Sequence, residues 1–152
     1  MDQNGSIPRL AFKTTVADVP LELCLPLCFA GLSEQVHPLC LLARQGTLQL
    51  LESHPDAETT VPPLLPQLVP SLRAAMADKE RDVAEAAIAV VGPLARVSKD
   101  HLVPYLERLL PPLARKASSG PLARKAMDAL RDIEDSVPGS SEKIKKKVPA
   151  YN

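Results

Sequence analysis

The apolar residues of this chain recur at helical spacing over most of its length. Between residues 79 and 97 they advance in steps of four and three, at Val83, Ala87, Val90, Leu94 and Val97. This spacing places them on one face of a helix. Asp78 precedes the segment as a candidate N-cap residue, and Glu80 lies in the first turn, where the helix dipole favours negative charge. The pattern predicts an amphipathic helix from about Lys79 to Val97.

The same arrangement repeats on both sides of this segment. Each repeat is a stripe of apolar residues that we expect to face a core, and Pro121 suits the first position of the last helix. In chain order the stripes are Leu23, Leu27 and Ala30, closed by Gly31; Leu39, Leu42, Gly46 and Leu50; Leu65, Leu68, Leu72 and Ala75; then, after Ser98, Leu102, Leu106, Leu109 and Leu113; and, after Ser119, Leu122, Ala126, Leu130 and Ile133.

A longer period is superimposed on the helical one. Leu-Pro-Leu at residues 25–27 returns as Leu-Pro-Gln-Leu at 65–68 and as Val-Pro-Tyr-Leu at 103–106, so the prolines stand 40 and 38 residues apart. Each of these prolines opens an expected helix that a second, proline-poor helix follows. Such a period is typical of HEAT-like repeats, of which at least three are needed for a stable stack. We therefore predict an all-α, armadillo/HEAT-like α-solenoid of about three helical hairpins.

The domain boundaries follow from where this rhythm starts and stops. Residues 1–18 are polar and aperiodic, and we interpret them as a loose N-terminal lead-in. Residues 19–138 form the predicted helical-repeat domain. Residues 139–152 contain four lysines and are predicted to be a basic C-terminal tail.

Prolines inside the stretch PPLLPQLVPSL, at 62–72, conflict with its helical leucine stripe. A proline in a helix interior removes a hydrogen bond and costs about 3 kcal/mol or more. Recurrent prolines such as Pro66 and Pro104 can fix bends where the first helix of each hairpin wraps the stack. Alternatively, Pro62 and Pro63 belong to a loop and Pro66 to a first turn, which leaves only Pro70 to bend a helix.

Composition narrows the class of protein. Of the 152 residues, 45% are hydrophobic but only 3% are aromatic, and there is no Trp. Leu, Val and Ala must therefore build the core, and the aromatic platforms typical of nucleic-acid binding are disfavoured. No apolar run of about 18 residues and no charged-then-apolar leader occurs, so we expect a soluble intracellular protein without a membrane span.

Charge is distributed unevenly along a chain that is neutral overall. Residues 1–100 hold 8 basic and 12 acidic residues, whereas residues 101–152 hold 10 and 6. PLARKA occurs at 112–117 and again at 121–126, at the end of one expected helix and the start of the next. We predict a docking surface for an acidic partner, a basic rim and tail made of Arg115, Lys116, Arg124, Lys125, Lys143, Lys145, Lys146, Lys147 and Tyr151. The alternative is a solvated tail with helix-end charges that the dipole favours.

Candidate chemistry is sparse. Cys24, Cys28, His37 and Cys40 offer zinc ligands, but Cys24 and Cys28 lie one helical turn apart among leucines, so core packing is the preferred interpretation and no metal is predicted. His37 and His54 each precede a proline, as loop residues do, and His101 stands apart. The carboxylates Glu80, Asp82 and Glu85 are expected on a solvated helix face. Without a phosphate-binding glycine loop or an activated nucleophile, we predict no enzyme, cofactor or small-molecule substrate.

Six blocks together resemble the parkin co-regulated protein family, particularly its shorter parkin co-regulated-like members. They are LAFK at 10–13, LPLCFAGL at 25–32, HPLCLLARQG at 37–46, LLPQLVPSLRAAM at 64–76, LVPYLERLLPPL at 102–113 and IKKKVPAY at 144–151. The likeness runs in order from about Arg9 to Asn152.

The resemblance implies a fold and a role. Members of that family fold as armadillo/HEAT-like α-solenoids without catalytic activity and are associated with ciliary and flagellar axonemes. The best-studied members bind tubulin at the inner junction of doublet microtubules. We therefore expect a structural, microtubule-binding protein of the cytoskeleton, with another inner-junction protein or chaperones as further partners. A soluble adaptor or chaperone-associated scaffold is the alternative.

One further residue is assigned a structural role. Arg44 emerges from an apolar helix beside Gly46, where a guanidinium can pair with a carboxylate or carbonyl of a neighbouring helix. Arg44 is expected to hold successive repeats in register in this way, and Gly46 is predicted to be a structural residue as well.

Overall fold

The described part of the protein consists of helices joined by short turns. The computed structural model describes residues 20–33, 39–118 and 120–148, and the side chains of residues 39–41 are also left out. Within these ranges there is no β-strand. The helices are α1 (Leu21–Ala30), α2 (Leu39–Ser53), α3 (Ala57–Met76), α4 (Arg81–Ser98), α5 (Leu106–Ser118), α6 (Ala123–Ser136) and α7 (Ser140–Lys147), with 3₁₀ segments η2 (Gly31–Ser33) and η3 (Lys99–Tyr105). The predicted all-α class is confirmed.

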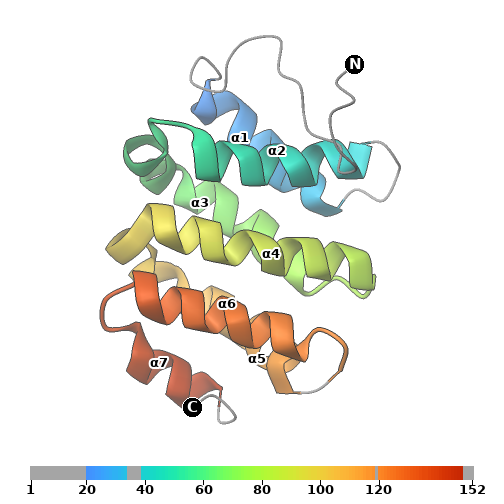
Figure 1. Ribbon diagram of the computed structural model, residues 1–152, viewed down its shortest axis with the longest axis vertical. Helices are drawn as coiled ribbons and strands as arrows, with labels where there is room; N and C mark the ends of the chain where they lie inside the picture. The colour runs from blue at the N-terminus through green and yellow to red at the C-terminus, as the bar shows by residue number, and fades with distance from the viewer. Residues whose placement is uncertain (1–19, 34–38, 119, 149–152) are drawn as a thin grey trace.

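Six of the helices pair into three antiparallel hairpins that follow one another through the molecule. Helices α1, α3 and α5 make up one layer, and α2, α4 and α6 lie side by side in front of it (Figure 1). Each hairpin packs on the next within both layers, with especially extensive contacts between α4 and α6 and between α3 and α4. The core lies between the layers.

Most of the predicted apolar stripes face this core. In α4, Val83, Ala87, Val90 and Leu94 are at most 1% exposed, and Val97 is partly buried against them. The stripes of the later helices are buried as well: Leu65, Leu68, Leu72 and Ala75; Leu102, Leu106, Leu109 and Leu113; and Leu122, Ala126, Leu130 and Ile133.

The stripe predicted for the first helix is wrong. Leu23 and Leu27 are 66% and 73% exposed, whereas Leu21, Leu25 and Phe29 are buried. The sequence of α1, LELCLPLCFA, carries apolar residues on nearly every side. Periodicity therefore cannot distinguish the face that packs on α3. In the next predicted stripe Leu42 is 44% exposed, while Gly46 and Leu50 are buried.

Helix α3 resolves the conflict between leucines and prolines. It runs without interruption from Ala57 to Met76, so Pro62, Pro63, Pro66 and Pro70 all lie inside it and the alternative of a loop at Pro62 and Pro63 is wrong. Pro63, Pro66 and Pro70 are exposed, opposite the buried leucines. The carbonyls that the prolines leave without an amide partner are thus on the side where water can bond them.

Several predicted helix starts are shifted. Helix α4 begins at Arg81 rather than Lys79, because the Asp78 carboxylate accepts a hydrogen bond from the Glu80 amide (2.8 Å) in a turn before the helix. Pro104 lies in η3, ahead of α5, and Pro66 lies in the middle of α3 rather than at its opening. Pro121 belongs to the turn before α6, which begins at Ala123.

The segment predicted as a basic tail contains a packed helix. Gly139, with φ of 75°, turns the chain into α7, which contacts α5 and α6. Ile144 and Val148 are buried, and the Ser140 hydroxyl donates to the Val137 carbonyl (2.7 Å) at the end of α6. Residues 140–148 therefore extend the core beyond the predicted boundary at 138.

Candidate partner-binding surface

The connections α3–α4 and α5–α6 lie next to each other at one end of the hairpins (Figure 1). A pocket of about 410 Å³ lies between them. Arg115 and Lys116 reach it from the last turn of α5, and Lys79 and Arg81 reach it from the start of α4. We call these four residues with Arg124 the basic end. Its pocket is floored by Met76, Pro112 and Leu122, which are buried.

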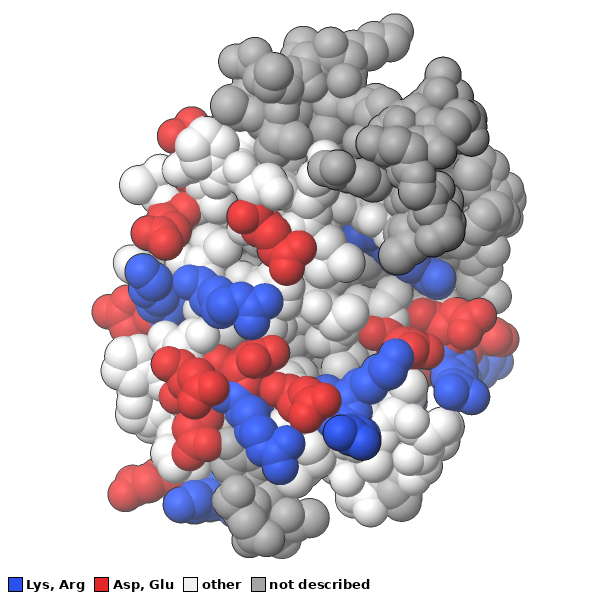
Figure 2. Space-filling model, in the orientation of Figure 1, with Lys and Arg blue, Asp and Glu red and all other residues white. Residues whose placement is uncertain are grey.

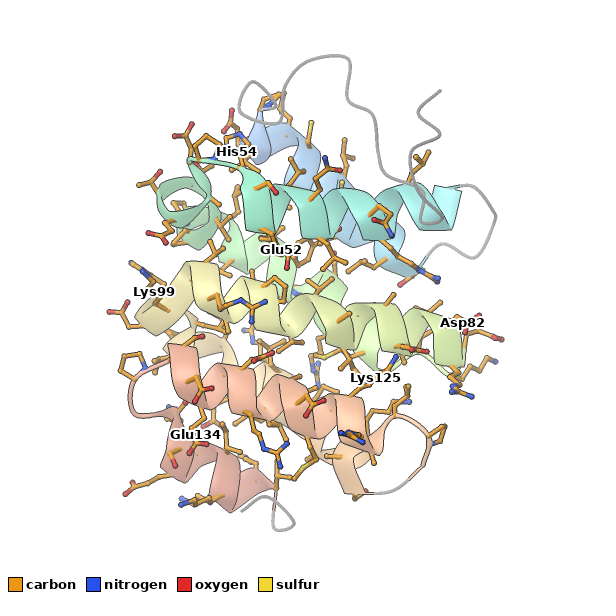
Figure 3. All side chains as sticks on the ribbon, viewed as in Figure 1. Glu52, His54, Asp82, Lys99, Lys125 and Glu134 are labelled. Carbon is orange, nitrogen blue, oxygen red and sulfur yellow. The ribbon has the colours of Figure 1, made fainter. Side chains whose placement is uncertain are left out.

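The predicted basic rim is only partly assembled here. Arg115 and Lys116 share the pocket, and Arg124 is exposed in the adjacent first turn of α6. Lys125 turns instead toward α4, where its ammonium donates a hydrogen bond to the Glu85 carboxylate. Figure 3 shows Lys125 between α6 and α4, toward the end of α4 that carries Asp82.

Two members of the basic end were missed by sequence reasoning. Lys79 and Arg81 alternate with Asp78, Glu80 and Asp82, so the segment reads as a mixed-charge helix start. In the fold, Lys79 and Arg81 line the pocket while none of the three carboxylates does. The local sequence carries no signal for this separation, because it depends on how the two hairpins pack.

The lysines of the predicted tail lie on α7. Lys145, Lys146 and Lys147 are exposed, Lys143 is half-buried, and Lys147 forms a salt bridge with Glu107 of α5 (3.6 Å). Tyr151 lies outside the described residues. The α7 lysines are therefore mounted on a helix that packs against the hairpins.

The layer of α2, α4 and α6 presents a different surface. Figure 2 shows acidic and basic side chains next to one another across this face. Arg96 of α4 lies between Glu52 of α2 (3.9 Å) and Asp132 of α6 (3.7 Å). All three side chains are about half exposed, so each pair contributes at most about 1 kcal/mol. Through these two salt bridges, the Arg96 side chain connects α4 to a helix of each neighbouring hairpin.

A second pocket, of about 450 Å³, lies on this mixed-charge face. Asp82, Glu85, Asp128 and Asp132 line it together with Arg44 and Lys125. The hydrogen bond from Lys125 lowers the pKa of Glu85 below its ordinary value, an effect that burial opposes and that Arg81 and Arg44 reinforce. The lining has four carboxylates and two cations, and Arg96 and Arg131 outside it offset part of this acidic excess through salt bridges with Asp132 and Asp128.

Arg44 lies beside a neighbouring helix, as predicted, but the predicted pairing of its guanidinium with a carboxylate or carbonyl is not formed among the described residues. It faces α4 across the second pocket and attracts the Glu85 carboxylate. Its Nε atom, however, is buried and has no hydrogen-bond partner in the described structure. Gly46, two residues further along α2, is buried.

The cysteines and histidines form no metal cluster among the described residues. Cys24 and Cys28 are partly buried against the core, and the pKa of the Cys28 thiol is raised by burial and by Cys24, against a hydrogen bond with Thr47. His54 lies in the turn before α3, as predicted, and its Nδ1 accepts the Asp56 amide (3.0 Å). His37 and the Cys40 side chain lie outside the described residues, so the four-ligand interpretation stays untested.

Two findings bear on the wider class of the chain. None of the helices built from the described residues is long and apolar enough to cross a bilayer. A family model described as Parkin co-regulated protein matches residues 1–152. The match covers the whole sequence, so the chain belongs to this family, as the six sequence blocks predicted.

Proposed function

We propose that this member of the Parkin co-regulated protein family is a non-enzymatic structural protein that binds microtubules in ciliary and flagellar axonemes. The observation that carries the proposal is the basic end, where Arg115, Lys116 and Arg124 are brought together with Lys79 and Arg81. Tubulin has a strongly acidic surface, so a cluster of cations on a stiff scaffold is suited to it.

The scaffold itself supports this role. We interpret the three stacked hairpins as an armadillo/HEAT-like α-solenoid, consistent with the 40- and 38-residue proline spacing. In such a stack each hairpin contacts its neighbours, which gives a broad surface suited to bridging two proteins. The mixed-charge face of α2, α4 and α6 would remain free for a second partner, such as another inner-junction protein, when the basic end is occupied.

Co-sedimentation with microtubules tests the proposal. The variant Arg115→Glu/Lys116→Glu/Arg124→Glu should pellet at least about tenfold less than the parent, and raised salt should weaken the parent's binding because exposed charges are screened. Lys125 is left unchanged, because its ammonium is already paired with Glu85 of α4 rather than turned toward the basic end.

A matched control carries the same charge change elsewhere. Lys99, Arg108 and Arg131 are exposed and do not line the basic pocket. The variant Lys99→Glu/Arg108→Glu/Arg131→Glu should pellet nearly like the parent. If the two variants behave alike, with helical content unchanged by circular dichroism, the basic end is not the microtubule-binding surface.

A second function is favoured by a separate observation. Leu23 and Leu27 expose two large apolar side chains on α1, as the surface of an adaptor or chaperone-associated scaffold does. Under this alternative, a pull-down recovers chaperones but no tubulin, and Leu23→Ser/Leu27→Ser abolishes the recovery. Recovery of tubulin that survives this double substitution favours the microtubule role.

A further inference from the structure

The pocket at the basic end has an unusually one-sided lining. Four of its nine described lining residues are Lys or Arg, and none is Asp or Glu. The four cations come from two hairpins, Lys79 and Arg81 from one and Arg115 and Lys116 from the next. Although the chain has equal numbers of acidic and basic residues, positive charge is concentrated in this pocket.

This charge is poorly compensated within the molecule. None of the four side chains forms a salt bridge with a described carboxylate, whereas Lys125 on α6 and Lys147 on α7 both do. Arg81 attracts Glu85 only from a distance.

Helix dipoles also disfavour two of these positions. Arg81 begins α4, and Lys79 lies two residues before it, so both lie at or next to a helix N-terminus where positive charge is unfavourable. An anion bound between the four cations would remove this electrostatic cost, so the free pocket is arranged for an anionic occupant.

The floor of the pocket indicates more than a simple anion. Met76 and Leu122 are at most 5% exposed, and Pro112 is buried beside them, so the cations surround an apolar base. A phosphate ion would leave this base unused. Single-stranded nucleic acid is disfavoured because its bases stack on aromatic side chains, and no aromatic residue is among the described lining.

We propose, in extension of the function proposed above, that this pocket binds an acidic peptide segment that carries an apolar side chain. The carboxylates of the segment pair with Lys79, Arg81, Arg115 and Lys116, and the apolar side chain packs on Met76, Pro112 and Leu122. Pairing to several cations at once positions an extended acidic segment between the two connections, so α4 and α5 both contribute to recognition.

The test uses a fluorescein-labelled oligo-glutamate peptide containing one leucine, and measures its binding to the full chain by fluorescence anisotropy. The variant Lys79→Gln/Arg81→Gln should bind about fivefold more weakly, since two charge pairs of modest strength are lost. Both residues are exposed and both substitutions relieve positive charge at a helix N-terminus, so folding is preserved. Arg108→Gln/Arg131→Gln, with the same charge change outside the pocket, should bind like the parent.

Further arms separate the classes of ligand. Replacing the leucine of the peptide by serine should weaken binding about threefold, and millimolar phosphate should compete poorly. Equal binding by the pocket variant and the control variant would overturn the proposal. It would also be overturned if single-stranded RNA, or vesicles of anionic lipid, bound with higher affinity than the peptide and lost that binding in Lys79→Gln/Arg81→Gln.

The outcome is distinguishable from that of the microtubule proposal. One possible result is peptide binding that depends on Lys79 and Arg81, without microtubule co-sedimentation. This result supports the pocket as a peptide-binding site and rejects tubulin as the partner. The other is co-sedimentation that depends on Arg124 but is unaffected by Lys79→Gln/Arg81→Gln. This result supports microtubule binding and rejects the pocket as the site that binds the acidic segment.

Discussion

Gly92 of α4 lies directly against the carboxylate of Asp132 on α6, so close that a Cβ atom at residue 92 would overlap Oδ2 of Asp132. Asp132 is held there by its salt bridge to Arg96, one turn after Gly92 (3.7 Å). A side chain at residue 92 would therefore require the Asp132 carboxylate to move, whereas the backbone of Gly92, whose φ is not in the left-handed region, sets no such requirement.

Valine at residue 92 is expected to displace the Asp132 side chain and to break its salt bridge with Arg96. Gly92→Val should lower the free energy of unfolding by about 2 kcal/mol, because a branched side chain meets the Asp132 carboxylate and overpacks the contact. Urea unfolding measures the change. Ala89→Val is the control. Ala89 is exposed and lines the second pocket, as Gly92 does, and the substitution should change the free energy of unfolding by less than about 1 kcal/mol. Equal effects would mean that a side chain at residue 92 does not meet the Asp132 carboxylate.

The buried face of α1 is testable by a pair of substitutions. Leu25 is fully buried, whereas Leu27 is 73% exposed. Leu25→Ala should lower the free energy of unfolding by about 3 kcal/mol, as other buried leucines do, and Leu27→Ala should lower it by less than about 0.5 kcal/mol. Denaturant melts of the two variants measure these changes. If Leu27→Ala cost more stability than Leu25→Ala, the buried face of α1 would be the one predicted from the sequence.

Helix α7 should contribute to stability as part of the fold. Ile144 is fully buried against the core, so Ile144→Ala is expected to cost about 2 kcal/mol or more. Lys145→Ala/Lys146→Ala removes two exposed lysines from the same helix and should leave stability within about 0.5 kcal/mol. Thermal melts followed by circular dichroism compare them. An Ile144→Ala variant as stable as the parent would show that residues 140–147 do not pack on α5 and α6.

The Glu85–Lys125 pair predicts a pH dependence. Its hydrogen bond lowers the pKa of Glu85 in the folded protein below the unfolded value near 4.5. The unfolded chain therefore binds the proton more readily, so the stabilisation is present above about pH 4.5 and disappears as pH falls through the folded pKa. The Lys125 side chain is 56% exposed, so the pair stabilises the folded protein by only about 0.5 kcal/mol.

Comparing Glu85→Gln with the parent isolates this contribution. The parent should be the more stable protein at pH 7, and the difference should be smaller at pH 3, where other acidic residues affect both proteins alike. Denaturant titrations at the two pH values give the difference directly. A gap that persists unchanged at pH 3 would show that the carboxylate charge of Glu85 is not its source.

Sequence reasoning succeeded where each helix has one apolar face. The stripes of α3 to α6 could be predicted because Leu, Val and Ala recur at helical spacing between polar residues. It failed for α1, whose apolar residues surround the helix, and for α7, where Ile144 is the one apolar residue between Ser140 and Lys147. In both helices, packing against neighbours rather than local pattern decides which side is buried.

The candidate surface was predictable only in part for a related reason. The two PLARKA segments indicated Arg115, Lys116, Arg124 and Lys125, but sequence alone could not show that Lys125 is paired with Glu85 of α4. It also could not place Lys79 and Arg81 beside them. Lys79 precedes α4 and Arg81 begins it, and the two share a pocket with residues of α5 only in the stacked hairpins.

Cross-linking the protein to microtubules with a zero-length carbodiimide tests the central claim most directly, because this reagent joins lysine amines only to carboxylates in direct contact. We predict cross-links from Lys79 and Lys116 to acidic residues of tubulin, which should disappear at high salt. Lys99, at the far end of α4, should give none. Cross-links from Lys99 with none from Lys79 or Lys116 would contradict the assignment of the basic end as the microtubule-binding surface.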